Sequence, residues 1–297
     1  MRKMALNYQL YLLLLPVVAY YVLFHYVPMY GVLIAFKDFS ATKGILGSPW
    51  VGLEHFQRFF ESYHFWTIIR NTLGLSLVSL IVGFPLPIIL ALLLNQLVFK
   101  RYKKFIQTVL YAPHFISVVV LVGMLFVFLS QKGAVNSLST SMGGERINFM
   151  SDPAWFKPLY ILSGVWQETG FACIIYLAAL SGVNPETHEA AIMDGASKRQ
   201  RIWNVDIPAI LPTAVILLIL ACGSIMNVGF EKAFLMQTPL NQPSAEIIST
   251  YVYKVGLQQA DYSFSAAVGL FNSVVNLILL VLVNSFAKRL SGSGLWA

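Results

Sequence analysis

Apolar residues form six long runs along the chain, and shorter polar segments separate them. The hydrocarbon core of a bilayer takes about 20 apolar residues per helix, and each run reaches that length. The pattern therefore predicts an all-α integral membrane protein with six transmembrane helices in a single domain, residues 1–297. The predicted spans are Leu10–Phe36, Thr72–Leu94, Phe105–Leu129, Leu159–Leu180, Ala209–Phe230 and Ser265–Phe286.

The first run is expected to stay in the mature protein as a span. It is too long and too rich in tyrosine for a cleaved signal peptide, and it ends in Pro28-Met29-Tyr30-Gly31 rather than at a small-residue cleavage site. Composition agrees with a membrane protein, because 57% of the residues are hydrophobic and only 11% are charged. A soluble domain carries about 25% charged residues.

Basic residues indicate which way the spans run. If both termini are cytoplasmic, 11 of the 20 Lys and Arg residues fall in short inner segments, and the other nine are spread over longer outer segments. Lys and Arg in short loops favour the cytoplasmic side, so the charge pattern predicts this orientation. The net charge of +7 then belongs to the cytoplasmic face and needs no nucleic-acid partner. The inner basic residues are Arg2, Lys3, Lys100, Arg101, Lys103, Lys104, Lys198, Arg199, Arg201, Lys288 and Arg289.

One polar segment, between the fourth and fifth spans, predicts two short cytoplasmic helices. Asn184 is a suitable N-cap for the first helix, with Pro185 at its first position, and Asp194-Gly195 ends it. Ser197 is a suitable N-cap for the second. One interpretation is a helix lying on lipid headgroups, although such helices bury bulky apolar residues. The alternative is close packing of a small-residue face, Ala190 and Ala191, against another protein.

The same segment resembles the EAA loop of permease subunits from bacterial ABC importers. The pattern E-A-A-x-x-D-G-A, followed by a hydrophobic-Pro pair at Ile207-Pro208, is complete. In that family the loop contains the coupling helix, which docks in a groove of the cytoplasmic ATPase. The resemblance implies an ABC type I importer permease fold, with the EAA loop at 181–208. It assigns the coupling role to Glu189, Ala190, Ala191, Asp194, Gly195 and Ala196.

Other segments resemble carbohydrate importers, and in particular the branch that carries complex oligosaccharides such as fragments of plant or algal polysaccharides (pectin or alginate). They are Tyr111-Ala112-Pro113, Gly229-Phe230-Glu231-Lys232, Ala260-Asp261-Tyr262-Ser263 and Ala267-Val268-Gly269-Leu270-Phe271-Asn272. The resemblance implies a second homologous permease, a cytoplasmic ATPase dimer and an extracytoplasmic solute-binding protein as partners, in the bacterial cytoplasmic membrane. The long outer insertion of the larger maltose permease subunit is absent here.

The resemblance also divides the single permease domain. Residues 1–67 are expected to hold the first span, which wraps the partner permease, and an outer segment. Residues 68–287 are expected to form the five-span importer core. The outer segment Lys37–Asn71 should be partly helical, and its aromatic residues suit a belt at the lipid interface. These are Phe56, Phe59, Phe60, Tyr63, Phe65 and Trp66.

The sequence contains no signature of an enzyme. It lacks the G-x-x-x-x-G-K-[ST] loop that holds nucleotide phosphates, so ATP hydrolysis is expected in a separate subunit. The His and Cys residues do not have metal-ligand spacing, and no nucleophile-elbow motif occurs. No metal or other cofactor is expected.

Polar residues within the spans are candidates for the substrate path. Glu168 lies midway along the fourth span, where an ionisable group is costly and faces a cavity or a partner. It either braces helices or lines the path. In the sixth span Ser265, Gly269, Asn272 and Asn276 fall on one helical stripe, although hydrogen bonding between helices explains the two amides equally well. The candidate residues are Gln167, Glu168, Asn227, Glu231, Asn272 and Asn276.

Sugar recognition combines hydrogen bonds to hydroxyl groups with apolar stacking faces. Trp166, Phe230 and Phe271 are near the candidate polar residues and are expected either to stack on sugar or to pack between helices. An alternative to the ABC permease is a self-sufficient secondary transporter that uses Glu168 as its proton site. That class often shows inverted repeats, and the sequence has no convincing internal repeat.

Overall fold

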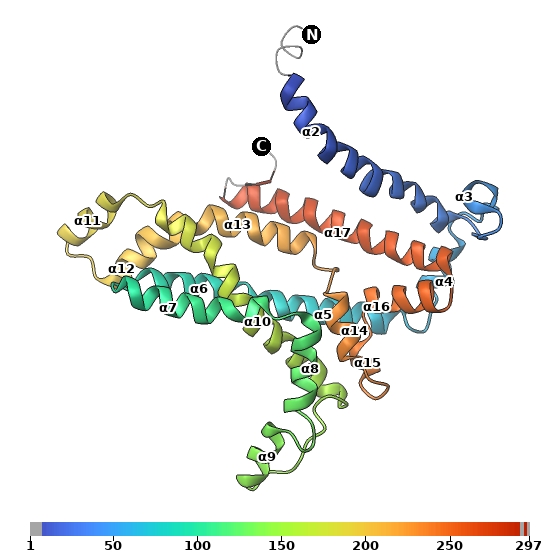
Figure 1. Cartoon of the computed structure of the whole chain (residues 1–297). Helices are drawn as coiled ribbons and strands as arrows, with labels where there is room; N and C mark the ends of the chain where they lie inside the picture. The colour runs from blue at the N-terminus through green and yellow to red at the C-terminus, as the bar shows by residue number, and fades with distance from the viewer. Residues whose placement is uncertain (1–7, 292–293, 296–297) are drawn as a thin grey trace. The chain divides into compact units, whose positions relative to one another are not determined.

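The computed structural model describes residues 8–291 and 294–295 (Figure 1). Nearly all regular structure in these residues is helical, as the apolar pattern predicts. An isolated antiparallel bridge between Lys37 and Trp50 is the one extended pairing that they contain. The all-α fold class is confirmed.

The described residues divide into two compact units. The first unit contains the chain up to Phe65 together with Val252–Phe271. The second contains Trp66–Tyr251 and the chain from Asn272 onward.

The first unit begins with a long apolar helix that changes its winding along its length. It starts as α2 and continues through a π-helical and a 3₁₀ segment, and its side chains are largely exposed, as expected for a surface that contacts lipid or another protein. The outer segment is partly helical, as predicted. The helical elements are α2 (Tyr8–Tyr21), Val22–Tyr26, Val27–Phe36, α3 (Gly44–Gly47), α4 (Glu54–Phe60), Lys254–Gln258 and the start of α17 (Tyr262–Ser291).

The core of the first unit is aromatic. Phe59 is fully buried, and its ring packs edge-on against those of Phe65, Phe264 and Phe271 at centroid distances of 5.0–6.2 Å. The expectation that Phe59 belongs to a lipid-interface belt is wrong, because its ring is enclosed by other rings rather than facing outward. Tyr63 is the residue of the outer segment that best fits a belt, with 92% of its surface exposed.

The second unit is built around one long helix, α10, which packs against α6, α7, α13 and α15. A close approach between α10 and α7 depends on Gly170, because a Cβ atom there would overlap the carbonyl group of Leu110. The helices of this unit are α5 (Phe65–Gly83), α6 (Pro85–Asn95), α7 (Lys100–Tyr111), α8 (Val118–Phe128), α9 (Ala134–Ser141), α10 (Pro153–Ser181), α11 (Pro185–Met193), α12 (Lys198–Arg201), α13 (Ile207–Gly223), α14 (Phe230–Met236), α15 (Gln242–Ala245) and α16 (Ile248–Tyr253), with α17 continuing into it.

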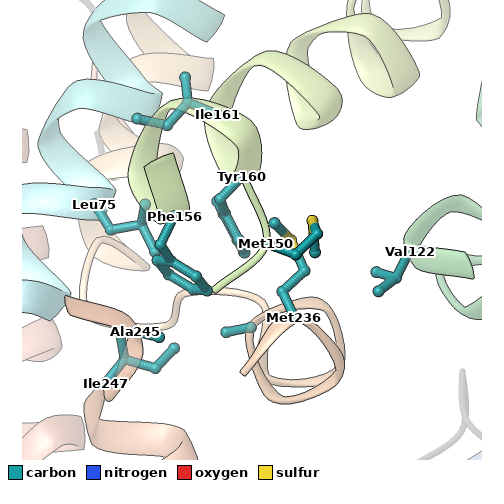
Figure 2. Close-up of a cluster of buried hydrophobic side chains, with 10 residues drawn as sticks. Leu75, Val122, Met150, Phe156, Tyr160, Ile161, Met236, Ala245 and Ile247 are labelled. Carbon is teal, nitrogen blue, oxygen red and sulfur yellow. The ribbon is translucent and has the colours of Figure 1, made fainter. Parts of the chain in front are cut away.

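A cluster of buried apolar side chains fixes the N-terminal third of α10 against its neighbours (Figure 2). Phe156 and Tyr160 of α10 lie in this cluster with Met236 of α14 and Ile247, which precedes α16. Close packing of this kind leaves the backbone of α10 little freedom. The cluster therefore holds α14 at a defined position on α10.

The predicted third span, Phe105–Leu129, is not one straight helix. Lys100–Phe115 and Val118–Phe128 meet at an angle of 93°. Pro113 lies in a 3₁₀ turn at the end of the first part, and its missing N–H cannot continue a helical ladder. Ser117 then restarts the helix, since its side chain accepts a hydrogen bond from the N–H of Val120.

The predicted fifth span, Ala209–Phe230, ends earlier than expected. The continuous helix Lys198–Gly223 stops at Gly223, and Phe230 begins the separate helix α14 after a short loop. Among the described residues, five helices are long and apolar enough to cross a membrane, or six when the bent pair counts as one span. The prediction of six spans agrees with the structure when the bent pair is counted as one span. The spans are Gln9–Phe36, Phe65–Asn95, Lys100–Phe115 with Val118–Phe128, Pro153–Ser181, Lys198–Gly223 and Tyr262–Arg289.

Candidate functional site

The polar segment after α10 folds as its capping residues predict. Asn184 caps α11, with its side-chain oxygen accepting a hydrogen bond from the N–H of Glu186 at 3.1 Å. Gly195 follows α11 with φ +76°, a left-handed conformation that a residue with a Cβ atom rarely adopts. Ser197 caps α12 and forms a reciprocal capping box with Gln200. Two short helices therefore stand at one end of the second unit, apart from α14 and α15 (Figure 1).

The side chains of α11 leave an apolar surface uncovered. Ala190 is exposed, Ala191 is half-buried, and Met193 is 86% exposed at the end of the helix, beside the exposed Ile192. Because exposed apolar residues of this kind mark protein contact sites, the surface is suited to a partner. Glu189, Asp194 and Gly195 are exposed and Ala196 is half-buried, so the predicted coupling residues form one short exposed stretch.

A buried carboxylate ties α11 to the membrane helices. Asp206 is fully buried at the start of α13, and its Oδ2 accepts a hydrogen bond from Gln96 Nε2 at 3.1 Å, at the end of α6. His188 of α11 lies on the other side, with Nε2 3.4 Å from Asp206 Oδ1. Three elements meet at this one side chain. Asp206, at the start of α13, therefore contacts both α6 and α11.

A cavity of about 510 Å³ lies elsewhere in the second unit, among α5, α6, α8, α10 and α14. Its size falls within the usual range for sites that hold small molecules. Gln167, Glu168 and Thr169 of α10 and Glu231 and Lys232 of α14 contribute polar groups to a mostly apolar wall.

Gln167 and Glu168 both connect α10 to the broken third span. Gln167 is buried, and its Nε2 donates a hydrogen bond to the carbonyl oxygen of Ile116 at 2.7 Å, where the helical ladder is interrupted. Glu168 Oε2 lies 2.9 Å from Nδ1 of His114, whose ring stacks on Phe171. The side chain of Glu168 stays 58% exposed and lines the cavity. Glu168 thus both braces helices and faces the candidate path.

Among the described residues that line the cavity, Lys232 is the buried cation. It is 7% exposed, and its Nζ donates a hydrogen bond to the carbonyl oxygen of Tyr160 at 2.8 Å. Lys232 lies beyond the end of the Lys198–Gly223 span. Burial lowers the pKa of its ammonium group to about 8, although the negative charge of Glu168 acts in the opposite direction. The sequence pattern does not indicate this burial, because a lysine near the end of a span usually extends to water.

The three candidate asparagines form one network. The side-chain oxygen of Asn227 accepts hydrogen bonds from Asn272 Nδ2 at 2.8 Å and from Asn276 Nδ2 at 3.1 Å. Asn276 is buried, and its Oδ1 accepts a hydrogen bond from the backbone N–H of Met226 at 3.0 Å. Asn227 also lines a second cavity of about 390 Å³, whose wall shares Ser79 with the first. The network holds the loop after α13 to α17.

The candidate stacking residues are in different places. Phe230 lines the 510 Å³ cavity, and Trp166 lines a separate cavity of about 470 Å³. Phe271 belongs to the aromatic core of the first unit. The structure therefore brings together Gln167, Glu168 and Glu231 in one wall, and Asn227, Asn272 and Asn276 in one network.

Sequence reasoning missed Lys232, His114 and the Asp206 contact. Each depends on residues that are far apart in the sequence, such as Gln96 with Asp206 and His114 with Glu168. A polar residue next to a proline break, as His114 is next to Pro113, was the one available signal.

The chain matches the family model described as "Binding-protein-dependent transport system inner membrane component" over residues 83–292. It is 48% identical to protein LplB of Bacillus subtilis (strain 168) over 288 residues, which is 97% of this chain and 91% of that protein. It is 47% identical to the polygalacturonan/rhamnogalacturonan transport system permease protein YteP of the same organism, covering 97% of this chain and 90% of that protein.

Solved structures are similar over almost the full length. A chain of a bacterial ABC transporter involved in the import of the acidic polysaccharide alginate matches with a TM-score of 0.91 and 41% identity, covering 98% of both chains. A second match, also with a TM-score of 0.91 and with 40% identity, is to a chain of the bacterial alginate ABC transporter in complex with an alginate pentasaccharide-bound periplasmic protein. It covers 99% of both chains.

Proposed function

The chain belongs to the family of binding-protein-dependent transport system inner membrane components, and we propose that this permease moves oligosaccharide fragments of polysaccharides into the cytoplasm. The relatives named for polygalacturonan, rhamnogalacturonan and alginate support this substrate class. The observation that carries the proposal is the 510 Å³ cavity, which combines amide, carboxylate and ammonium groups with an apolar wall, as sugar recognition requires.

The EAA loop is the proposed point of energy coupling. Glu189, Ala190, Ala191, Asp194, Gly195 and Ala196 would dock against a separate cytoplasmic ATPase. The exposed Ile192 and Met193 and the left-handed Gly195 support a preformed docking surface. The Asp206 contact would then pass ATPase movement to α6 and α13.

The proposed assembly contains this chain, a second homologous permease of different sequence, two ATPase copies and an external solute-binding protein. The match to a transporter solved with its periplasmic protein supports the last of these partners. The long exposed helix Gln9–Phe36 would lie against the partner permease or lipid. Residues 68–287 would form the importer core, with both termini in the cytoplasm.

The proposed substrate path runs along the 510 Å³ cavity and the adjoining 390 Å³ cavity. Gln167, Glu168 and Glu231 would contact sugar hydroxyls in the first, and Asn227 in the second. Asn272 and Asn276 would act on the path through Asn227. Binding would be weak and transient, because tight binding would hold the sugar in the pore. Specificity would then rest largely with the external binding protein.

Reconstitution into proteoliposomes tests the proposal. The complex of both permeases and the ATPase is supplied with the binding protein and a galacturonate or alginate oligosaccharide, and uptake is measured with ATP inside. We expect uptake that needs both ATP and the binding protein. Uptake by this chain alone, driven by a proton gradient, would instead establish a secondary transporter. A transport-competent complex containing only this permease would contradict the second, different permease.

A further inference from the structure

Lys232 is a buried cation whose surroundings leave room for its ammonium group. Its Nζ lies 4.6 Å from the ring centroid of Tyr160, in addition to its hydrogen bond to the Tyr160 carbonyl oxygen. A Cβ atom on Gly164 would lie 3.1 Å from Nζ, so a larger residue there would crowd the ammonium group. Tyr160 and Gly164 of α10 thus leave a space that the ammonium group of Lys232 fills.

No carboxylate of the described residues forms a direct ion pair with this ammonium group, although Glu168 and Glu231 lie in the same cavity wall. Within the part of the chain that the structure describes, no carboxylate oxygen lies within 4.0 Å of Lys232 Nζ. The carboxylate of Glu168, which acts on Lys232 electrostatically, has its close contact with His114 instead. Burial of an ammonium group without an opposite charge is costly, so an unpaired lysine in a cavity wall favours an anion there.

Lys232 also has hydrogen-bonding capacity to spare. An ammonium group has three N–H donors, and the Tyr160 carbonyl takes one of them. No other acceptor contacts Nζ among the described residues, and Lys232 lines the 510 Å³ cavity. Glu168 and Glu231 lie in the same wall as acceptors for hydroxyl groups, and Phe230 adds an apolar face. The cavity therefore offers one cation among hydroxyl-binding groups.

We propose that Lys232 binds the carboxylate of a uronic acid residue in this cavity, and that it makes the translocation path select acidic over neutral oligosaccharides. The inference rests on the proposed function, since it assigns a residue of the transport path. A sugar carboxylate would supply the direct ion pair that Lys232 lacks among the described residues, and the remaining ring hydroxyls would face Glu168, Glu231 and Thr169. A charge-assisted hydrogen bond is stronger than a neutral one, so the preference should be large.

The test measures binding to the purified permease–ATPase complex without its binding protein, so that recognition outside the membrane does not contribute. The probes are trigalacturonate and its fully methyl-esterified form, which has the same ring hydroxyls and no charge. Affinities are obtained from the shift in melting temperature over a concentration series. We expect the parent complex to bind the acid about tenfold or more tightly than the ester.

Lys232→Met should abolish this preference, and Lys232→Arg should retain it, because Arg keeps the charge. Gly164→Ala should reduce the preference, since the added methyl group displaces the ammonium group without removing it. Lys157→Met is the matched control, because Lys157 is a partly buried lysine of α10 outside the cavity wall, and it should keep the preference.

The proposal is overturned if Lys232→Met keeps the preference for the acid, or if the parent complex shows none. It is also overturned if Lys232→Met weakens acid and ester equally, since Lys232 would then only brace α14 against Tyr160. Failure of the proposed transport function would be seen differently from failure of the Lys232 proposal, because the parent complex would then show no ATP-driven uptake of any oligosaccharide.

Discussion

At the residue scale, the lowered pKa of Lys232 predicts a pH-dependent preference for acidic sugar. In the empty cavity the ammonium group is charged below pH 8 and loses its proton above it. A sugar carboxylate, with a pKa of roughly 3–4, stays ionised throughout this range. Affinity for trigalacturonate should therefore be constant from pH 6 to 7 and fall by up to about tenfold per unit above pH 8.

Three other titratable groups of the cavity wall could also change the affinity with pH, so the experiment needs a control. Glu168, Glu231 and the Tyr160 hydroxyl lie in the same wall, on α10 and α14. Titration of the Lys232→Arg complex separates them from Lys232, because the guanidinium group stays protonated to pH 9.5. A flat profile in Lys232→Arg supports the assignment, and an equal fall in both complexes contradicts it.

Asn276 predicts a stability effect. Its side chain accepts a hydrogen bond from the backbone N–H of Met226 and donates one to Asn227. Asn276→Leu therefore leaves the buried N–H of Met226 without an acceptor. The cost should be on the order of 1–3 kcal/mol, seen as a lower midpoint in thermal unfolding of the purified complex. Val274→Leu, at an exposed position of the same helix, is the control and should have little effect. Normal stability with lost transport would instead place Asn276 directly in the substrate path.

At the element scale, the structure of α11 and of the glycine turn after it predicts which substitutions separate sugar uptake from ATP hydrolysis. Gly195→Val forces a β-branched residue into φ +76°, and Ala190→Trp adds bulk to an exposed position of the proposed docking surface. Each change should lower ATP-driven sugar uptake at least tenfold, while the chain still inserts into the membrane.

Milder replacements at the same two positions are the controls. Gly195→Asn can adopt the left-handed conformation, and Ala190→Ser adds only one oxygen atom, so both should retain most uptake. The readouts are uptake and sugar-stimulated ATP hydrolysis in proteoliposomes. Parent-level transport by both Gly195→Val and Ala190→Trp would remove the docking role from α11.

At the scale of the whole molecule, the proposed orientation predicts which loops are reached from each side. Thr42 in the outer segment and Ser197 before α12 are both exposed. In a background without Cys173 and Cys222, Thr42→Cys should react with an impermeant thiol reagent added outside the cell. Ser197→Cys should react only after the membrane is opened. Thr42 is chosen over Ser48 of the same segment, because Ser48 is buried and its hydroxyl donates a hydrogen bond to the carbonyl oxygen of Gly44. The opposite labelling pattern would reverse the topology.

Features that depend on local rules can be predicted from the amino-acid sequence alone. Long apolar runs predict spans because an unpaired backbone group is too costly in lipid, and only a helix satisfies all of them within one segment. Asn184, Gly195 and Ser197 predict the ends of α11 and α12 because capping and left-handed turns involve residues only a few positions apart. The family resemblance rested on the same segment, and the match over residues 83–292 confirms it.

Contacts between residues that are distant in the sequence depend on how the helices pack. Proline at 113 indicates a break, but the 93° bend and the contact of Gln167 with Ile116 depend on how α10 packs. The outer aromatic residues could equally face lipid or one another, and packing placed Phe59 in a core. Lys232 is buried because the cluster around Tyr160 fixes α14 against α10 and Gly164 leaves space there. The burial and charge pairing of a side chain depend on residues that are far away in the sequence. The pattern of polar and apolar residues along the chain therefore does not predict them.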